Sequence, residues 1–385
     1  MGNQIACKYL KSKIPFNISL LSALLVSINI SVAQVKEEIK WYNPSAEKSP
    51  VLHQQLWNEN TVNSFYDRLP ANAEKSVRKE VWNLSRNAAG LKLIFNTNAE
   101  EIIIRYTTSR PRSGYAMNHF PATGVSGVDL FAENSDNSWL WANGKYDFKD
   151  TITYTYTGLS LEKEKYKNGR NFHLYLPLYN GVKWLEIGVP IGSTFKFIPV
   201  STEKPIIVYG TSIAQGGCAS RAGMAWTNIL NRQLNIPVVN LGFSGNGKLE
   251  KEVVDLIVEK EAKIFILDCL PNLGGEIENI KPKTIYAVNA IRAKYPETPI
   301  ILVDGSHYTE GRMNGARIKG INTINKTGFE AYKELQSGGV KKIFYLKRED
   351  IGLDMNDSVD GTHPTDIGML KYAKAYEKLI KTILK

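Results

Sequence analysis

Three side chains in the sequence could act together as a nucleophile, a base and an acid that orients the base. Ser212 follows a short apolar segment that ends at Gly210, and a serine where a strand turns into a helix can present its Oγ beside free backbone N–H groups. His363 lies three residues after Asp360, so the carboxylate can reach the imidazole Nδ1–H and leave Nε2 free as a base. Singly, the serine is typical of a helix cap and the histidine of a surface turn. Together they indicate nucleophilic catalysis by a serine.

Two further loops could supply hydrogen-bond donors to the same place. The segment from Asn240 to Gly247 contains three glycines, which let a backbone turn sharply and approach a ligand closely. It lacks the GxGxxG and GxxxxGKS/T patterns, which argues against a nucleotide site. Asn272 could direct its side-chain N–H₂ toward this crevice, or could simply form a turn beside Pro271.

These loops follow apolar segments that alternate with amphipathic ones. We predict strands at residues 204–209, 237–241, 263–268, 299–304 and 342–346, and helices at 223–234, 248–261, 280–295, 315–335 and 365–384. Apolar strands that alternate with helices imply a parallel sheet covered on both faces. Ligands of such sheets bind at the carboxyl ends of the strands. The loops that carry the candidate residues should therefore meet at one edge of the sheet.

The sequence before residue 200 has a different period. Residues 151–157 alternate strictly between threonine and a larger apolar residue, and residues 91–97 and 101–108 also read as half-buried strands. Asn-Gly pairs begin at residues 143, 168 and 180, where they predict hairpin turns. This pattern indicates an antiparallel sandwich or jelly roll. Six of the seven tryptophans lie here; they could stack on sugar rings or serve as packing, and both interpretations stay open.

The composition excludes several classes of protein. With 385 residues, of which 43% are hydrophobic and 22% charged, the chain is long enough for two globular domains and is neither disordered nor collagen-like. Three cysteines outside CxxC pairs exclude a disulfide scaffold and a structural zinc site of that pattern. The net charge is +10, but the lysines are dispersed and no recognition motif occurs, so we expect no nucleic-acid partner.

The first 33 residues have the order of a secretory signal peptide. Three lysines precede an apolar stretch from Ile14 to Ile30, and Ser31-Val32-Ala33 follows it. The alternative, a membrane anchor, is disfavoured because the stretch is shorter and more polar than the roughly 20 apolar residues that a span needs. We therefore expect a secreted or periplasmic protein without stable membrane insertion. Its mature chain is expected to divide into domains at residues 34–200 and 201–385.

The four loops resemble, in order, the sequence blocks of the SGNH hydrolase (GDSL-type lipase and esterase) superfamily. The matching segments are Gly210-Thr211-Ser212, Asn240 to Gly245, Pro271-Asn272 and Asp360-Gly361-Thr362-His363-Pro364. Upstream, Gly127-Val128-Asp129-Leu130-Phe131 is similar to the GxDLY motif of a sandwich domain that precedes one branch of these enzymes. The resemblance implies an α/β fold. An SGNH-type, flavodoxin-like parallel-sheet hydrolase domain would follow an antiparallel, jelly-roll-like β-sandwich.

The resemblance also implies a role for each matching residue. Ser212 would be the nucleophile, His363 the general base, and Asp360 the carboxylate that orients the base. The oxyanion donors would be the backbone N–H groups of Ser212 and Gly245 and the side-chain amide of Asn272. Neither a metal nor a cofactor would take part. Further substrate contacts are expected from two residues of the same loops, Gln215 and Asn246.

Three positions depart from the family pattern, and two cysteines lie near the expected site. Thr211 replaces the Asp of the first block, Leu273 the Asp that often ends the third, and Phe131 the Tyr of GxDLY. None of these belongs to the expected triad. Cys218 and Cys269 both approach the expected active-site edge, so a disulfide between them is one interpretation and two buried thiols the other.

The sequence thus predicts a secreted serine esterase that removes a small acyl group, with acetyl as the expected one, from a carbohydrate or another ester. Two other interpretations stay open. An acyltransferase would use the same serine but pass the acyl group to a sugar hydroxyl rather than to water. A non-catalytic carbohydrate-binding protein would keep the sandwich and need no triad. The expected partner is a small-molecule or polysaccharide ester, and the sequence does not define an oligomeric state.

Overall fold

The computed structural model describes most of the chain after the predicted leader, in four segments: residues 38–58, 60–159, 165–305 and 313–385. From Glu38 to Lys385 the chain forms one compact unit. The predicted signal peptide at residues 1–33 lies outside the described residues. Within the described segments, no helix is long and apolar enough to cross a membrane. The domain boundary that we expect near residue 200 stays a prediction.

A five-stranded parallel sheet occupies the C-terminal half, in the order β13-β12-β14-β15-β16. Its strands are β12 (Ile206–Gly210), β13 (Val238–Gly242), β14 (Ile264–Asp268), β15 (Ile300–Val303) and β16 (Ile343–Leu346). Every residue of β12, β13 and β14 is buried, as apolar strands covered on both faces must be. The strand order is the flavodoxin-like one, and the predicted fold class of this half is confirmed.

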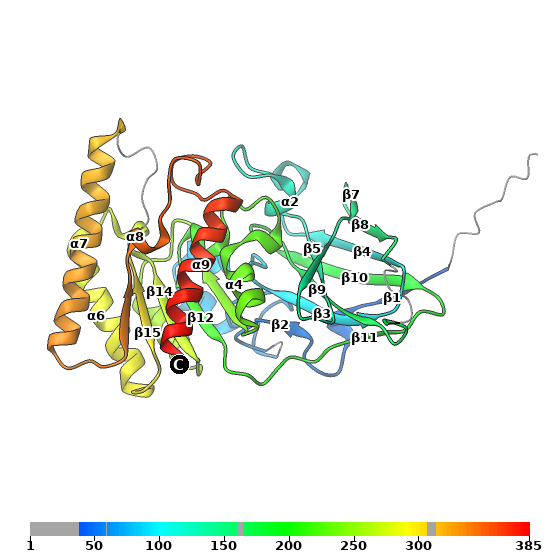
Figure 1. Cartoon of the computed structure of the whole chain (residues 1–385), viewed down its shortest axis with the longest axis horizontal. Coiled ribbons are helices and arrows are strands. Elements are labelled where there is room, and N and C mark those ends of the chain that lie inside the picture. Colours follow the sequence, from blue (N-terminus) through cyan, green and yellow to red (C-terminus); the bar gives the residue numbers. More distant parts are fainter. Residues whose placement is uncertain (1–37, 59, 160–164, 306–312) are drawn as a thin grey trace, which may run out of the picture. The chain divides into compact units, whose positions relative to one another are not determined.

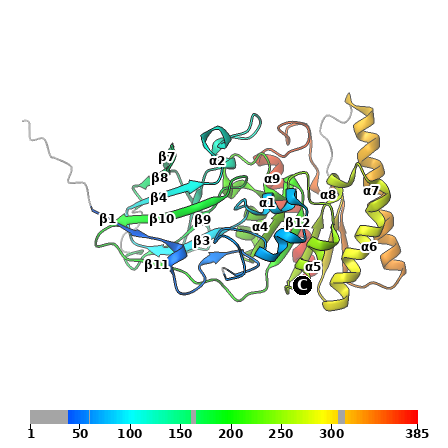
Figure 2. The ribbon, with the colours of Figure 1, turned by 180° about the vertical axis from the view of Figure 1, so that it is seen from behind.

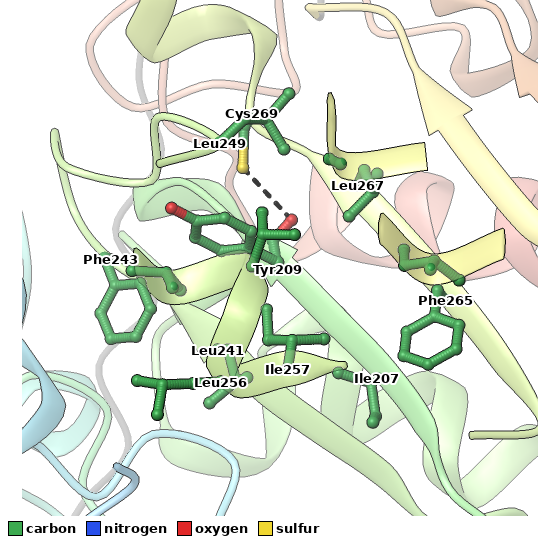
Figure 3. Close-up of a cluster of buried hydrophobic side chains, with 14 of the residues drawn as sticks. Ile207, Tyr209, Leu241, Phe243, Leu249, Leu256, Ile257, Phe265, Leu267 and Cys269 are labelled. Carbon is green, nitrogen blue, oxygen red and sulfur yellow. Dashed lines mark hydrogen bonds between the residues drawn. The ribbon is translucent and has the colours of Figure 1, made fainter. Parts of the chain in front are cut away.

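Helices cover both faces of this sheet (Figures 1 and 2). One face packs on α4 (Trp226–Leu234) and α9 (Asp366–Ile383); the other packs on α5 (Lys251–Ile257), α6 (Ile277–Lys294) and α7 (Gly315–Ser337). Alternate residues of one strand enter the two cores. Ile206 and Val208 of β12 lie in the first core, and Ile207 and Tyr209 in the second, which Figure 3 shows.

The N-terminal half contains two antiparallel sheets that pack face to face over a shared core. The first has the order β1-β10-β4-β8-β7, with β1 (Ile39–Tyr42), β4 (Glu101–Thr108), β7 (Lys145–Phe148), β8 (Ile152–Thr157) and β10 (Val182–Pro190). The second has the order β11-β3-β9-β5-β6 with β2 beside β3: β2 (Leu52–His53), β3 (Lys92–Thr97), β5 (Asp129–Glu133), β6 (Trp139–Ala142), β9 (Arg170–Tyr175) and β11 (Phe195–Phe197). The predicted β-sandwich is confirmed.

The hairpin turns predicted at the Asn-Gly pairs are wrong for the two pairs that directly join strands. Asn143 and Gly144 connect β6 to β7, and Asn180 and Gly181 connect β9 to β10; in both cases the two strands belong to different sheets. Asn180 is instead fully buried. Its side-chain oxygen accepts from the backbone N–H of Arg110 at 3.0 Å, so the residue stabilises a crossing between sheets.

Part of the N-terminal half packs against the parallel sheet rather than the sandwich. Trp57 lies in a loop and Trp82 in α1 (Lys79–Ser85). Both belong to the core that also contains Tyr209. Of the six tryptophans before residue 200, Trp141 is the exposed one, at 49%. Packing is therefore the role of most of these tryptophans, and Trp141 is the one whose exposure would allow contact with a ligand.

Candidate active site

The serine lies where the sequence predicts it, at the carboxyl end of the central strand. Strand β12 ends at Gly210 and the one-turn helix α3 (Ser212–Gln215) begins two residues later, with the Thr211 hydroxyl accepting from the backbone N–H of Ile213. A Cβ at Gly210 would come within 2.6 Å of the Ala214 Cβ, so this turn requires glycine there. Ser212 itself is 8% exposed.

His363 connects Ser212 and Asp360 through its two ring nitrogens. Nε2 lies 2.9 Å from the Ser212 Oγ, and Nδ1 lies 2.7 Å from Oδ2 of Asp360. An ionised carboxylate can only accept a hydrogen bond, so Nδ1 carries the proton and Nε2 presents its lone pair to the serine hydroxyl. The structure thus brings Ser212, His363 and Asp360 into one hydrogen-bonded chain.

The environment of Asp360 keeps its carboxylate ionised. Partial burial alone would raise the pKa of Asp360, but hydrogen bonds outweigh it and lower the pKa to about 2. The donors are the backbone N–H of His363 at 2.8 Å, the His363 ring, and the backbone N–H of Thr362 at 3.0 Å. Gly361 makes this turn possible with a φ of 84°. The negative charge is therefore fixed opposite the imidazole.

Besides the backbone N–H of Ser212, the candidate oxyanion donors lie on the loops that follow the two strands beside β12. Gly245, after β13, is exposed and has a φ of 68°. Asn272 lies in the short helix η5 (Leu270–Leu273) after β14. In the amide orientation that satisfies its neighbours, its side-chain oxygen accepts from the backbone N–H groups of Asn246 at 3.0 Å and Gly247 at 3.1 Å. This leaves its N–H₂ group available as a donor.

Close contacts tie these loops to the serine turn. A Cβ at Gly247 would lie 1.9 Å from the carbonyl oxygen of Gly210, so only glycine lets the two loops approach this far. Gln215 reinforces the junction, because its side-chain oxygen accepts from the backbone N–H of Ser244 at 2.9 Å. The three loops therefore form one contiguous rim, although the sequence separates them widely.

The two residues predicted to contact substrate have different surroundings. Gln215 is fully buried, and its amide nitrogen donates to the carbonyl oxygen of Leu178 at 3.1 Å. Because both its polar groups bind protein, the prediction that Gln215 contacts substrate is wrong. Asn246 is partly exposed; its side-chain oxygen accepts from Arg78 and its nitrogen donates to Ser244, each at 2.9 Å. A substrate contact of Asn246 stays a prediction.

Of the two interpretations of Cys218 and Cys269, the structure supports two buried thiols and contradicts the disulfide. Cys269 belongs to the core on one face of the parallel sheet, where its Sγ donates to the carbonyl oxygen of Tyr209 at 3.4 Å (Figure 3). Cys218 belongs to the core on the opposite face. A disulfide needs Cα atoms within about 7 Å and converging Cβ atoms, and residues on opposite faces of a sheet do not meet this requirement.

The N-terminal half supplies a buried cation to the loop that carries Gly245, and the sequence alone did not reveal this contact. Arg68 is 2% exposed, and its Nη1 donates to the carbonyl oxygens of Asn240 at 3.0 Å and Gly242 at 2.9 Å. Its other nitrogens donate to the carbonyl oxygens of Leu84 and Asn87. Burial lowers the pKa of Arg68 to about 9. The residue thereby fixes the end of β13, from which the Gly245 loop departs.

The aspartate of the GxDLY-like segment connects the sandwich to the chain that follows the serine. Asp129 is 3% exposed. Its Oδ2 accepts from the Arg221 guanidinium at 2.5 Å and from the backbone N–H of Gly223 at 2.9 Å, and its Oδ1 accepts from the Trp141 indole at 2.8 Å. The motif thus has a structural role in this protein, because its carboxylate is one of the groups that connect the two halves.

A second histidine stands beside the first, and sequence reasoning did not select it. The ring centroids of His119 and His363 lie 5.8 Å apart. His119 is exposed and comes from a loop of the N-terminal half. Nothing in the local sequence around His119 relates it to the catalytic-type blocks, which lie more than 90 residues further along the chain.

Comparison with known proteins covers nearly all of the described chain. Residues 203–381 match the GDSL-like lipase/acylhydrolase family, and residues 39–195 match the GxDLY domain, described as the N-terminus of esterases of the SGNH-hydrolase type. A solved protein from Bacteroides ovatus, described as a GDSL-like lipase, is 30% identical with a TM-score of 0.81; the match covers 90% of this chain and 98% of that one. No curated protein matches the sequence.

Two more distant structures share the fold. A salicylyl-acyltransferase from a tetracycline biosynthetic pathway is 16% identical with a TM-score of 0.69, over 90% of this chain and 97% of that one. An acetyl xylan esterase from Butyrivibrio proteoclasticus is 11% identical with a TM-score of 0.51, over 90% of this chain and 99% of that one. At these identities the likeness concerns the fold alone.

Proposed function

The chain belongs to the GDSL-like lipase/acylhydrolase family, and from this premise we propose that it is a secreted serine esterase that removes a small acyl group, such as acetyl, from a carbohydrate. The observation that carries the proposal is the chain of hydrogen bonds in which His363 joins the Ser212 hydroxyl to the Asp360 carboxylate. In this proposal Ser212 is the nucleophile, His363 the general base and acid, and Asp360 the group that orients the imidazole.

The first half of the reaction acylates the serine. As the Ser212 Oγ attacks the ester carbonyl carbon, Nε2 of His363 takes the hydroxyl proton, and the carbonyl oxygen becomes an oxyanion. The Asp360 carboxylate stabilises the imidazolium that forms. The tetrahedral intermediate collapses when the bond to the alcohol oxygen breaks. His363 gives its proton to that oxygen, the alcohol leaves, and the acyl group remains on Ser212.

The second half returns the enzyme to its starting state. A water molecule attacks the acyl carbon while His363 takes one of its protons, and a second oxyanion forms. When this intermediate collapses, His363 protonates the departing Ser212 Oγ. The products are the free carboxylic acid and the regenerated serine, so no redox agent or cofactor is consumed.

Three hydrogen-bond donors are assigned to the oxyanion. They are the backbone N–H groups of Ser212 and Gly245 and the side-chain amide of Asn272. Support comes from the amide oxygen of Asn272, whose two backbone donors fix the orientation of its N–H₂ group, and from Gly245, which has open space where a Cβ would stand. One such donor contributes about 2.7–4 kcal/mol to stabilising the transition state.

A carbohydrate as the alcohol part of the substrate is supported by a cavity of about 280 Å³ on the sandwich. Trp141 and Tyr146 line it and are 49% and 56% exposed. Ser220 and Arg221, which follow the serine helix along the chain, line it too. Exposed aromatic rings next to polar groups suit the apolar face and the hydroxyl groups of a sugar.

The principal alternative is an acyltransferase, which would use the same acyl-serine but pass the acyl group to an alcohol. The fold does not decide between the two reactions, since fold alone does not define function. A non-catalytic carbohydrate-binding protein is disfavoured because it would have no use for the hydrogen-bonded serine, histidine and aspartate.

Hydrolysis of p-nitrophenyl acetate by the wild-type protein and by Ser212→Ala tests the proposal. The wild type should release p-nitrophenol far above background, and Ser212→Ala should fall to background while its thermal unfolding midpoint is unchanged. Ser201 is exposed, so Ser201→Ala serves as the matched control and should keep full activity. Equal background rates for the wild type and Ser212→Ala would overturn the esterase assignment. Acetate release across a panel of acetylated glycans would then define the substrate.

A further inference from the structure

Three potential metal ligands from different parts of the chain converge at the candidate active site. They are a ring nitrogen of His119, the Sγ of Cys218 and a ring nitrogen of His363. These three atoms all lie within 4.8 Å of one another. We propose that these side chains form a binding site for a zinc ion, which inhibits the enzyme reversibly by occupying its general base. The inhibitory effect rests on the proposed function, whereas the binding of the ion does not.

The loop that carries His119 is fixed on both sides of that residue. Met117 and Phe120 exchange two backbone hydrogen bonds, of 2.9 and 3.0 Å, which close a tight turn with His119 at its tip. Phe120 is 2% exposed and packs edge-on against the Tyr179 ring at 5.1 Å. The Tyr179 hydroxyl in turn donates to the carbonyl oxygen of Ser212. The position of His119 is therefore coupled to that of the serine turn.

Cys218 reaches the same place from the end of the serine helix. The helix α3 ends at Gln215 and is capped by Gly216, and the backbone N–H of Gly217 donates to the carbonyl oxygen of Ser212 at 2.8 Å. This bond folds the chain back, so that Cys218, which directly follows Gly217, lies beside the two histidines. Cys218 is 5% exposed and belongs to the core that also contains α4 and α9.

The set of one thiolate and two imidazoles matches the ligand preference of zinc. Zn²⁺ binds sulfur at about 2.3 Å and imidazole nitrogen at about 2.0–2.1 Å in tetrahedral sites, so the ligand atoms stand roughly 3.3–3.6 Å apart. Since the present spacings are at most 4.8 Å, contraction to these values requires movements of about 1 Å. His119 is exposed, so its side chain has room to move. A water molecule or the Ser212 hydroxyl would complete the tetrahedron.

The consequence for catalysis follows from the two nitrogens of His363. Nδ1 donates its proton to Asp360, so Nε2 carries the lone pair that a metal can take. The same lone pair must accept the proton of Ser212 in the proposed reaction. Metal binding releases the thiol proton of Cys218 to solvent and involves no oxidation. While the ion is bound, His363 cannot act as a base.

A titration with Co²⁺ tests the site directly, because cobalt bound to a thiolate gives a near-ultraviolet charge-transfer band. The wild type and Ser212→Ala should both develop this band with one equivalent of metal, since the nucleophile is not needed for binding. Cys218→Ser should lose the band, and His119→Ala should weaken binding at least tenfold. Cys269→Ser is the matched control and should bind as the wild type does, because its thiol lies on the opposite face of the sheet.

Inhibition is measured separately, with Zn²⁺ and p-nitrophenyl acetate. The variants His119→Ala, Cys218→Ser and Cys269→Ser should all keep the metal-free activity. The first two should need at least about tenfold more Zn²⁺ for half-inhibition. A cobalt complex without a thiolate band in the wild type, or equal sensitivity of the wild type and His119→Ala to Zn²⁺, would overturn the proposal. If the protein lacked esterase activity, the proposed function would fail, and the cobalt titration of Ser212→Ala would still decide the site.

Discussion

Arg68 donates a hydrogen bond of 2.9 Å to the carbonyl oxygen of Gly242, a residue 174 positions later in the chain. The guanidinium is buried without an ion-pair partner in direct contact among the described residues, and it donates only to backbone carbonyl oxygens. Its geometry suits this purpose because five N–H donors point outward in a fixed plane. The N-terminal half thus helps to hold the rim of the candidate active site in place.

We expect Arg68→Met to lower the free energy of unfolding by roughly 3 kcal/mol or more, because several buried carbonyl oxygens lose their donor at once. Urea denaturation of the purified variant measures this. The exposed pair of Arg112 with Asp150 provides the control, and Arg112→Ala should change stability by less than about 1 kcal/mol. A value for Arg68→Met as small as that of the control would contradict the role assigned to Arg68.

The lowered pKa of Asp360 predicts a specific dependence of stability on pH. Because the folded-state pKa of about 2 lies below the ordinary value of 3.8, the carboxylate stabilises the folded state above about pH 4 and loses this contribution as the pH falls toward 2. Asp360→Asn has no such group. The difference in unfolding free energy between the wild type and Asp360→Asn should therefore shrink from pH 5 to about pH 2; a difference that stays constant would contradict the assigned ionisation.

The same substitution should act on catalysis through the tautomer of the histidine. An amide at position 360 can donate to Nδ1 of His363, which would then hold its proton on Nε2, the wrong nitrogen for taking the serine proton. We expect Asp360→Asn to reduce kcat by about 10⁴-fold, with little change in KM. Initial rates with p-nitrophenyl acetate at neutral pH measure this effect. A loss below about tenfold would show that Asp360 does not orient the base.

Asn272→Ala should remove one oxyanion donor and lower kcat by about 10²–10³-fold, while KM changes little, because the donor acts on the transition state. Asn322, which is exposed and accepts from Arg348, is the matched control, and Asn322→Ala should keep the wild-type rate. If Asn272→Ala raised KM with an unchanged kcat, the residue would bind substrate and would not stabilise an oxyanion.

Trp141 tests whether the sandwich contacts the sugar. We expect Trp141→Ala to raise KM for an acetylated oligosaccharide between about two- and tenfold through loss of ring stacking, and to leave KM for p-nitrophenyl acetate unchanged. Tyr146→Phe keeps its ring and should behave as the wild type with both substrates. Equal KM values of the wild type and Trp141→Ala for the oligosaccharide would exclude the aromatic cavity as a sugar site.

Local patterns predicted the fold and the candidate triad because the relevant signals are short. The residues of the serine turn, and Asp360 with His363, each lie within a few positions of a strand end or a helix start. Arg68 could not be found in this way, because its two acceptors at the site, Asn240 and Gly242, lie 172 and 174 positions away and no periodicity marks them. The role of Asp129 was equally hidden, although its motif was visible.

The wrong predictions have a common physical origin. Cys218 and Cys269 each lie near a loop of the site, but proximity along the chain does not say which face of the sheet a side chain enters. The Asn-Gly pairs have the local conformation of turns, but which sheet receives the next strand depends on packing across the whole sandwich. Gln215 has a polar side chain near the serine, but its amide group already forms hydrogen bonds with the backbone of Ser244 and Leu178.

Covalent labelling is the most direct test of whether Ser212 is a nucleophile activated by His363. A fluorophosphonate reacts with an activated serine by forming a phosphorus–oxygen bond and releasing fluoride, and peptide mass spectrometry locates the adduct. If Ser212 is the nucleophile, the protein carries one adduct per chain, on Ser212, that is absent from Ser212→Ala and forms far more slowly in His363→Ala. An adduct on another residue, or labelling of Ser212→Ala at the wild-type rate, would show that Ser212 is not the activated serine.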